Sequence, residues 1–227
     1  MREDDGPRIS EERHHSSPRE LRPVANSTRN DTGGAPRLFR RRMLGLLALL
    51  PAACTSPNPN LYTLAAVPGP VHARAPARIE LRLIALAHYL DRTQIVRSSE
   101  DFRLDVLGND WWGEPLDSML SRVLVQELSQ RLPSSTVYGE NSAITAAPDA
   151  SVELNVQRMD EDRSGALLLL AQVAVTRAGQ VMQARNLHFA VPPRAVGTAG
   201  LVGAMSVAVG DLADTIAEML STAHLRR

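Results

Sequence analysis

Cys54 is the only cysteine in the chain, and its position most constrains what this sequence can fold into. A single thiol cannot form a disulfide within the chain, so an exported fold here must be held by its hydrophobic core alone. The residues before it, 43–53, form a short apolar run that follows three arginines. A basic segment, an apolar stretch of about ten residues and small residues before a cleavage site are typical of a secretory signal. A membrane-spanning helix would need about 20 apolar residues.

The cysteine directly follows Ala52–Ala53, which predicts a lipoprotein signal: the thiol receives a diacylglyceryl group and becomes the mature N-terminus. Pro51 stands where a lipobox usually carries Leu, and Leu50 is one residue further back. The alternative is an ordinary signal with an incidental thiol. We expect lipidation at Cys54 and attachment to a membrane through that lipid. Because the next residue is Thr55 and not the Asp that retains many lipoproteins in the inner membrane, we expect an outer membrane lipoprotein facing the periplasm.

Residues 1–42 are polar and lack apolar periodicity. Such a segment cannot bury enough surface to offset its ordering entropy, so we expect a disordered leader. It is long for the basic region of a signal, which favours a start codon assigned too early, with translation beginning near Leu38. The alternative is a long basic region for twin-arginine export. The expected organisation is the leader (1–42), the hydrophobic region of the signal (43–53), a lipidated tether (54–60) and one folded domain (61–222).

The domain alternates between strand-like and helix-like periodicity. Alternation of polar and apolar residues predicts short strands, and a 3.6-residue period predicts two helices. The strands are expected at 61–64, 79–83, 94–97, 102–106 and 136–138, and the helices at 115–132 and 196–220, with an antiparallel meander over 150–191. Trp111–Trp112 is expected to open the first helix, with one Trp covering the core. The predicted fold class is α+β: a mostly antiparallel sheet with two packed helices in a single domain.

No catalytic or metal-binding pattern stands out. The six histidines lack metal-ligand spacing, and the glycines of 197–203 lack the order of a phosphate-binding loop. Asp160–Glu161–Asp162 lacks the Gly and the distal Glu of a calcium loop, which favours a solvated turn over a cation site. The 25 basic and 25 acidic residues balance, so nucleic acid is not indicated as a partner. We expect a protein without enzymatic activity, cofactor or metal.

Three segments together resemble a known family. Tyr62-Thr63-Leu64 follows the cysteine closely, residues 89–96 read Y-L-D-R-T-Q-I-V, and residues 112–116 read W-G-E-P-L. In order and spacing they are similar to the ABC-type transport auxiliary lipoproteins, the PqiC-like family, over residues 61–220. The resemblance implies a non-enzymatic accessory role in intermembrane lipid transport, with an MCE-domain protein and an ABC permease complex as partners and a separate ATPase supplying energy. The sequence has no Walker motif, which fits that division of labour.

Within the second segment, Asp91 suits an Asx turn, Arg92 suits pairing with a carboxylate, and Gln94 offers an amide that a purely structural turn does not need. The segment is either a fold-defining turn or a surface for self-association or for the MCE partner. On the second interpretation, the candidate partner interface comprises Tyr89, Asp91, Arg92 and Gln94, and homo-oligomerisation is left open. The alternative function is that of a general envelope lipoprotein acting in cell-wall or outer-membrane assembly without a transport partner.

Overall fold

The computed structural model of the protein describes residues 58–222, apart from 145, 179 and 181. The expected leader, the signal region and the lipidation site at Cys54 therefore lie outside the described residues. The elements, in chain order, are β1 (Asn60–Tyr62), β2 (Arg78–Leu86), β3 (Gln94–Ser98), β4 (Asp105–Trp112), α1 (Leu116–Arg131), β5 (Thr136–Gly139), β6 (Ala150–Glu161), β7 (Leu167–Arg177), β8 (Gln183–Val191) and α2 (Gly197–Thr222).

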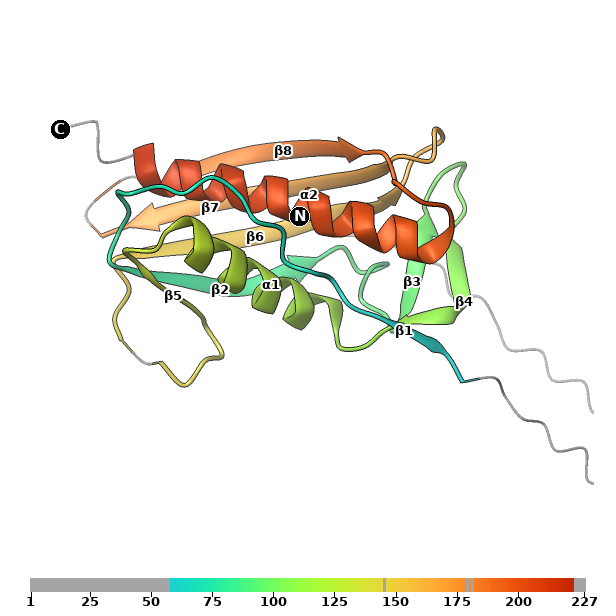
Figure 1. Ribbon diagram of the computed structural model, residues 1–227, viewed down its shortest axis with the longest axis horizontal. Helices are drawn as coiled ribbons and strands as arrows, with labels where there is room; N and C mark the ends of the chain where they lie inside the picture. Colours follow the sequence, from blue (N-terminus) through green and yellow to red (C-terminus); the bar gives the residue numbers. More distant parts are fainter. Residues whose placement is uncertain (1–57, 145, 179, 181, 223–227) are drawn as a thin grey trace, which may run out of the picture. The chain divides into compact units, whose positions relative to one another are not determined.

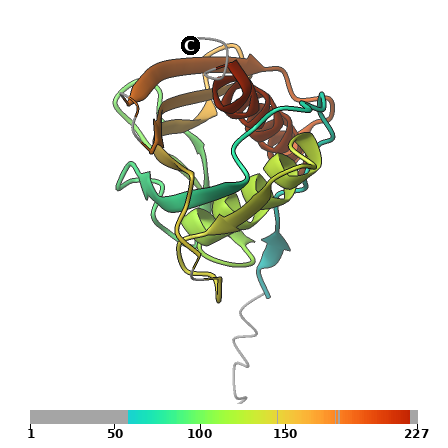
Figure 2. The same ribbon diagram turned by 90° about the vertical axis from the view of Figure 1, so that its left-hand side faces the viewer.

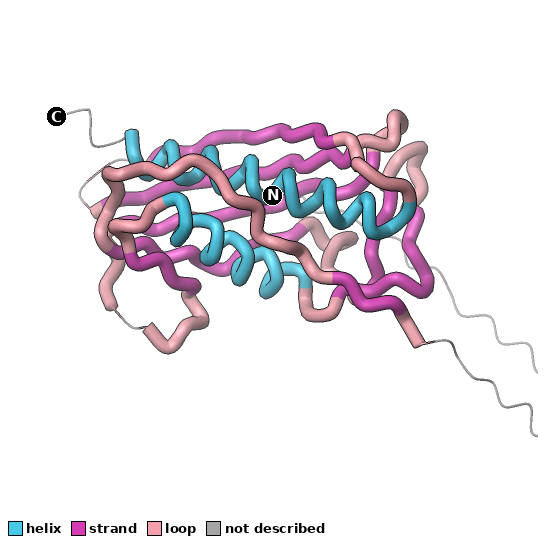
Figure 3. Tube along the Cα trace, in the orientation of Figure 1, coloured by secondary structure: helices cyan, strands magenta, loops and turns pink. Residues whose placement is uncertain are grey.

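The strands form one mixed sheet (Figures 1 and 3). The meander of β6, β7 and β8 is antiparallel, as predicted. On the other side of β6, however, β2 pairs in parallel, and β5 then pairs in parallel with β2. The pairs β1–β4 and β3–β6 are also parallel, whereas β3–β4 is antiparallel. Most strand pairings in the described part of the chain are thus parallel, and the expectation of a mostly antiparallel sheet was wrong.

The reason for the error is physical. Alternation of apolar side chains indicates a strand with one buried face, but it carries no information on strand direction. The connection from β2 to β5 contains a hairpin and helix α1, and the connection from β2 to β6 is longer still. Long crossovers of this kind return the chain to the end where it started and permit parallel pairing.

Both helices lie on the same face of the sheet, as the two perpendicular views show (Figures 1 and 2). The core lies between them and the alternating inward residues of β6 and β7, such as Val152, Leu154 and Val173. Helix α2 has the length and mean hydropathy (1.3) of a membrane-spanning helix, but most of its apolar stretch is buried inside the domain. It is therefore the central core helix of this domain. The predicted single α+β domain with two packed helices is confirmed over the described residues.

The segment around Trp111–Trp112 differs from the prediction. These residues end β4, and α1 begins only at Leu116. Trp112 is nevertheless buried in the core, as is Leu116. Strand β4 itself begins at Asp105, later than expected, because Asp101 and Phe102 have positive φ angles of 54° and 61°. Left-handed backbone cannot continue a strand, so residues 102–104 belong to the loop between β3 and β4.

Residues 63–77, which we call the strap, connect β1 to β2. The strap runs over α1 and α2 before the chain enters the sheet (Figures 1 and 3). Its main-chain N–H groups find acceptors on both helices: Ala65 N donates to Ser206 Oγ of α2 (3.1 Å), and Gly69 N donates to Gln130 Oε1 of α1 (3.1 Å). The strap is therefore a structural third layer over the helix pair, although it contains no regular element.

Candidate functional site

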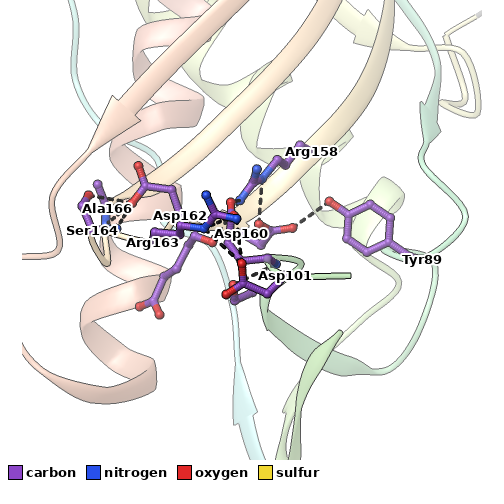
Figure 4. A network of polar contacts seen from close by, with 11 residues as sticks. Tyr89, Asp101, Arg158, Asp160, Asp162, Arg163, Ser164 and Ala166 are labelled. Atoms are coloured by element: carbon purple, nitrogen blue, oxygen red, sulfur yellow. Dashed lines mark hydrogen bonds and ion pairs between the residues drawn. The ribbon is translucent and has the colours of Figure 1, made fainter. Parts of the chain in front are cut away.

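The Tyr89 side chain points inward from the turn that follows β2 (Figure 4). Its hydroxyl donates a 2.7 Å hydrogen bond to Oδ2 of Asp160, a fully buried carboxylate on β6. Burial, together with the neighbouring carboxylate, raises the pKa of the Tyr89 hydroxyl. The hydroxyl therefore stays protonated and keeps donating, which ties the turn to the sheet.

Arg158 neutralises the same buried carboxylate. Its Nε lies 2.8 Å from Asp160 Oδ1, and its Nη2 lies 2.6 Å from Oε1 of Glu100 in the loop after β3. A charge-assisted network of this kind satisfies a carboxylate that would be costly to bury alone. Asp101 in the same loop binds Arg163 at 2.6 Å (Figure 4), and Arg163 Nε also lies 3.4 Å from Oε2 of Glu100. Three ion pairs thus join this loop to the β6–β7 hairpin.

The acidic triplet at 160–162 is thus only partly the expected solvated turn. Asp160 is buried, whereas Asp162 closes the turn by accepting from Ser164 N at 2.8 Å and from Ala166 N at 3.1 Å. The prediction failed for Asp160 because β6 continues to Glu161 and turns that side chain toward Tyr89. Within the described residues no cluster of His, Cys, Asp and Glu could hold a metal ion.

The other residues of the predicted interface lie around the Tyr89 turn. Asp91 is exposed, and its carboxylate has no hydrogen-bond partner among the described residues, so the expected Asx turn does not form. Arg92 Nε donates to the main-chain oxygen of Tyr89 at 2.8 Å, and not to a carboxylate as expected. Gln94 is half-buried at the start of β3, opposite Trp111. The four residues share one turn and strand start, with Tyr89 directed inward and Asp91 outward.

A second polar cluster, which sequence reasoning missed, joins the strap to the helices. The side chain of Arg131, on α1, is fully buried and lies between the strap and α2. Its Nε is 2.5 Å from Oδ1 of Asp214, while Nη1 and Nη2 donate to the main-chain oxygens of Val67 (3.0 Å) and Gly210 (3.1 Å). One guanidinium on α1 thus binds two other segments, the strap and α2, which suits the fixed fork of donors on arginine.

Glu127 lies one helical turn before Arg131 and is only 1% exposed. Its Oε1 accepts from Val67 N at 2.8 Å, but its Oε2 is buried without a partner in the described part of the chain. Burial raises the pKa of the Glu127 carboxyl to about 7, and the nearby Arg131 only partly offsets that effect. A sequence signal for this cluster did exist: both residues fall on the apolar stripe of α1, among Leu120, Leu124 and Leu128.

The sheet face that the helices leave open is hollowed across β2, β6, β7 and β8, with a volume of about 650 Å³. Charged and amide side chains line much of this hollow, including Arg82, Glu153, Asn155 and Arg185. The polar members of this lining can bind water and polar groups.

The described side chains define a domain whose polar clusters tie its own elements together and form no recognisable catalytic constellation. Residues 62–217 match the family of the ABC-type transport auxiliary lipoprotein component. Because the match spans nearly the whole folded domain, the chain belongs to this family, as the resemblance predicted. It is an auxiliary lipoprotein component of an ABC-type transport system in the bacterial envelope, and the family is generally non-enzymatic.

Solved structures share the fold. A crystal structure of an uncharacterized protein has a TM-score of 0.62 and 20% identity, covering 72% of this chain and 99% of that chain. A Xanthomonas campestris protein of the family DUF330 has a TM-score of 0.58 and 18% identity, covering 71% of this chain and 93% of that chain. Comparison with curated proteins gave no significant match.

Proposed function

We propose that this protein is a non-enzymatic accessory lipoprotein of an MCE/ABC-type system that moves lipids between the membranes of the bacterial envelope. The observation that carries the proposal is family membership over residues 62–217, combined with the Y-L-D-R-T-Q-I-V segment at 89–96. The partners are an MCE-domain protein and an ABC permease complex, and a separate ATPase supplies the energy.

The proposal includes the anchor. Cys54 carries the lipid, and Thr55 directs the protein to the outer membrane, where the domain faces the periplasm. Cys54→Ser should abolish labelling by a clickable fatty acid and release the protein from membranes. Thr55→Asp should leave labelling intact and shift the protein to inner-membrane fractions of a density gradient. Equal labelling of the wild type and Cys54→Ser would contradict lipidation, and an unchanged gradient position of Thr55→Asp would contradict the sorting argument.

The proposal also gives the Tyr89 turn two roles. Tyr89 positions the turn through the buried Asp160, and the outer side chains of Asp91, Arg92 and Gln94 contact the MCE-domain partner. The turn is suited to this because its position is fixed by an internal bond, so polar side chains on it are presented in a constant arrangement.

Co-purification from cross-linked envelopes tests the partner and the surface together. Gln94→Ala and Arg92→Ala should reduce recovery of the MCE-domain protein while the thermal unfolding of the domain changes little. Arg74→Ala is the matched control, because Arg74 is an exposed arginine on the strap. Lowered unfolding temperature with normal recovery would make the segment a structural turn only. If the wild-type protein recovers no MCE-domain protein or permease, the general envelope lipoprotein becomes the better description.

A further inference from the structure

We infer that the end of the domain carrying the β3–β4 loop rests on the membrane surface and inserts Phe102 into the lipid interface. The inference rests on the proposed lipidation of Cys54. It adds a protein–lipid contact surface that is separate from the lipid anchor and from the Tyr89 turn.

The first argument is the length of the tether. Asn58, the first described residue, follows Cys54 by only four positions. Four residues span at most about 14 Å even when fully extended. The start of β1 at Asn60, six positions from Cys54, therefore lies within about 22 Å of the lipid. This short reach favours an orientation in which the end of the domain that carries β1 faces the membrane.

The second argument identifies that end. Asn60 Nδ2 donates to Asp110 Oδ1 on β4 at 2.8 Å, and Asp110 also accepts a hydrogen bond from Thr198 in the first turn of α2. The loop before α2 and the β6–β7 turn, residues 164–166, line a common surface hollow. The ion pair of Arg163 with Asp101 then joins that turn to the β3–β4 loop. The β3–β4 loop, the β6–β7 turn and the loop before α2 lie close together at one end of the domain (Figure 1). Strand β1 lies at the same end, beside the last residues of β4.

The third argument is exposure. Among the large hydrophobic residues of the described chain, Phe102 (111%) and Val196 (98%) are the most exposed, and both lie at this end, joined there by Leu61 and Leu104. Phe102 gains no burial within the domain, yet its left-handed backbone, with φ of 61°, is unfavourable for a residue with a side chain. Insertion into the lipid interface supplies the burial that the domain does not.

The charged residues at this end indicate whether the domain would contact the lipid surface by apolar insertion or by electrostatic attraction. This end carries three arginines and four acidic residues, so basic residues do not dominate it: Arg103, Arg163 and Arg194 against Glu100, Asp101, Glu161 and Asp162. The contact we infer is therefore apolar, supported by the anchor, and it should persist in high salt.

Fluorescence of the full mature lipoprotein in vesicles of phosphatidylethanolamine and phosphatidylglycerol tests the inference. Acylation removes the only native thiol, so Phe102→Cys and, separately, Val196→Cys each provide one site for an environment-sensitive label. Leu83→Cys is the control, because Leu83 is also exposed (62%) but lies on β2 away from this end. We expect a blue shift of the label at 102 and loss of its intensity with nitroxide-bearing phospholipids, at low and high salt, with neither effect at 83.

The label at 196 reports on the same end of the domain without replacing Phe102. It should show the same blue shift and the same loss of intensity. If the labels at 102 and 196 respond to aqueous iodide as strongly as the label at 83, the membrane contact is refuted. Protection at 102 only when the MCE-domain partner is added would also overturn it, in favour of a protein interface. Incorporation of label into the unsubstituted protein would instead reveal a free Cys54 and refute the proposed lipidation.

Discussion

Replacing Glu127 by Gln should remove a pH dependence of stability that this one buried carboxyl creates. Its Oε2 has no partner, and its pKa in the folded protein is about 7 against 4.5 for an ordinary glutamic acid. Gln is close in shape and neutral at every pH. Its carbonyl oxygen can still accept the hydrogen bond from Val67 N that Glu127 Oε1 accepts at 2.8 Å.

The sign of this pH dependence follows from the number of protons that the folded and unfolded states bind. Below pH 4.5 both states hold the proton, and the group contributes no pH dependence. Between 4.5 and about 7 the folded state keeps a proton that the unfolded state has released, so the free energy of unfolding falls as the pH rises. Each unit of pKa difference corresponds to about 1.4 kcal/mol, so the loss accumulates to about 3 kcal/mol and then levels off. In a domain of this size that is about 6–12 °C in unfolding temperature.

Urea unfolding of the domain from Ser56 onward, followed by circular dichroism from pH 4 to 9, measures the effect. Glu218→Gln is the matched control, because Glu218 is an exposed glutamate on α2. At pH 8 Glu127→Gln should be more stable than the wild type by about 3 kcal/mol, and at pH 4 the two should coincide. Burial also raises the pKa of Asp211 and so adds to the wild-type slope, which is why the difference between the two proteins is the quantity to compare.

A Glu127→Gln protein that loses stability with pH as steeply as the wild type would refute this reasoning. Lower stability of the variant at every pH would show that the ionised carboxylate is required next to Arg131. The burial of the side chain would then not dominate its energetics.

Two further substitutions test the contacts that hold the strap on the helices and the Tyr89 turn on the sheet. Gly69→Ala should destabilise the domain by about 1–3 kcal/mol, because a Cβ there would lie 2.3 Å from Arg131 Nη2. Gly108→Ala, with no atom within 4 Å of its Cβ, should not show this clash. Equal melting of the two variants would contradict the close packing of the strap against Arg131. Tyr89→Phe should cost about 1–2 kcal/mol in urea unfolding, because the buried Asp160 loses one donor. An unchanged midpoint would mean that the bond contributes nothing net.

Most of the element order could be predicted from the sequence. The apolar stripes that form α1 and α2 and the alternation along β6 to β8 depend on neighbours within the same segment, so they are visible without a structure. The breaks at Pro133 and at Pro192–Pro193 are equally local. The end of α1 and the loop before α2 lie where these prolines indicated.

The rest depended on contacts distant in sequence. The parallel pairing of β2 with β6 joins residues about seventy positions apart, and no local pattern encodes its direction. Asp160 looked like part of a solvated acidic turn because its partner Tyr89 is equally remote. The left-handed backbone of Phe102 also has no signal in a residue type that normally favours strands. The polar cluster around Arg131 could have been predicted, since a charged residue on an apolar helix face needs a buried partner.

The strap has a mechanical consequence. It follows β1, which pairs with β4 over only three residues, and it passes over the helix pair before the chain joins the sheet at β2. Tension from a membrane anchor would first load β1 against β4 in shear, and then the bonds of Val67 to Glu127 and Arg131. Because these bonds join the strap to α1, and Arg131 joins it to α2, the load is shared by both helices before it reaches the strands. An anchor upstream of β1 would thereby be coupled to the helices of the core as well as to the edge strand β1.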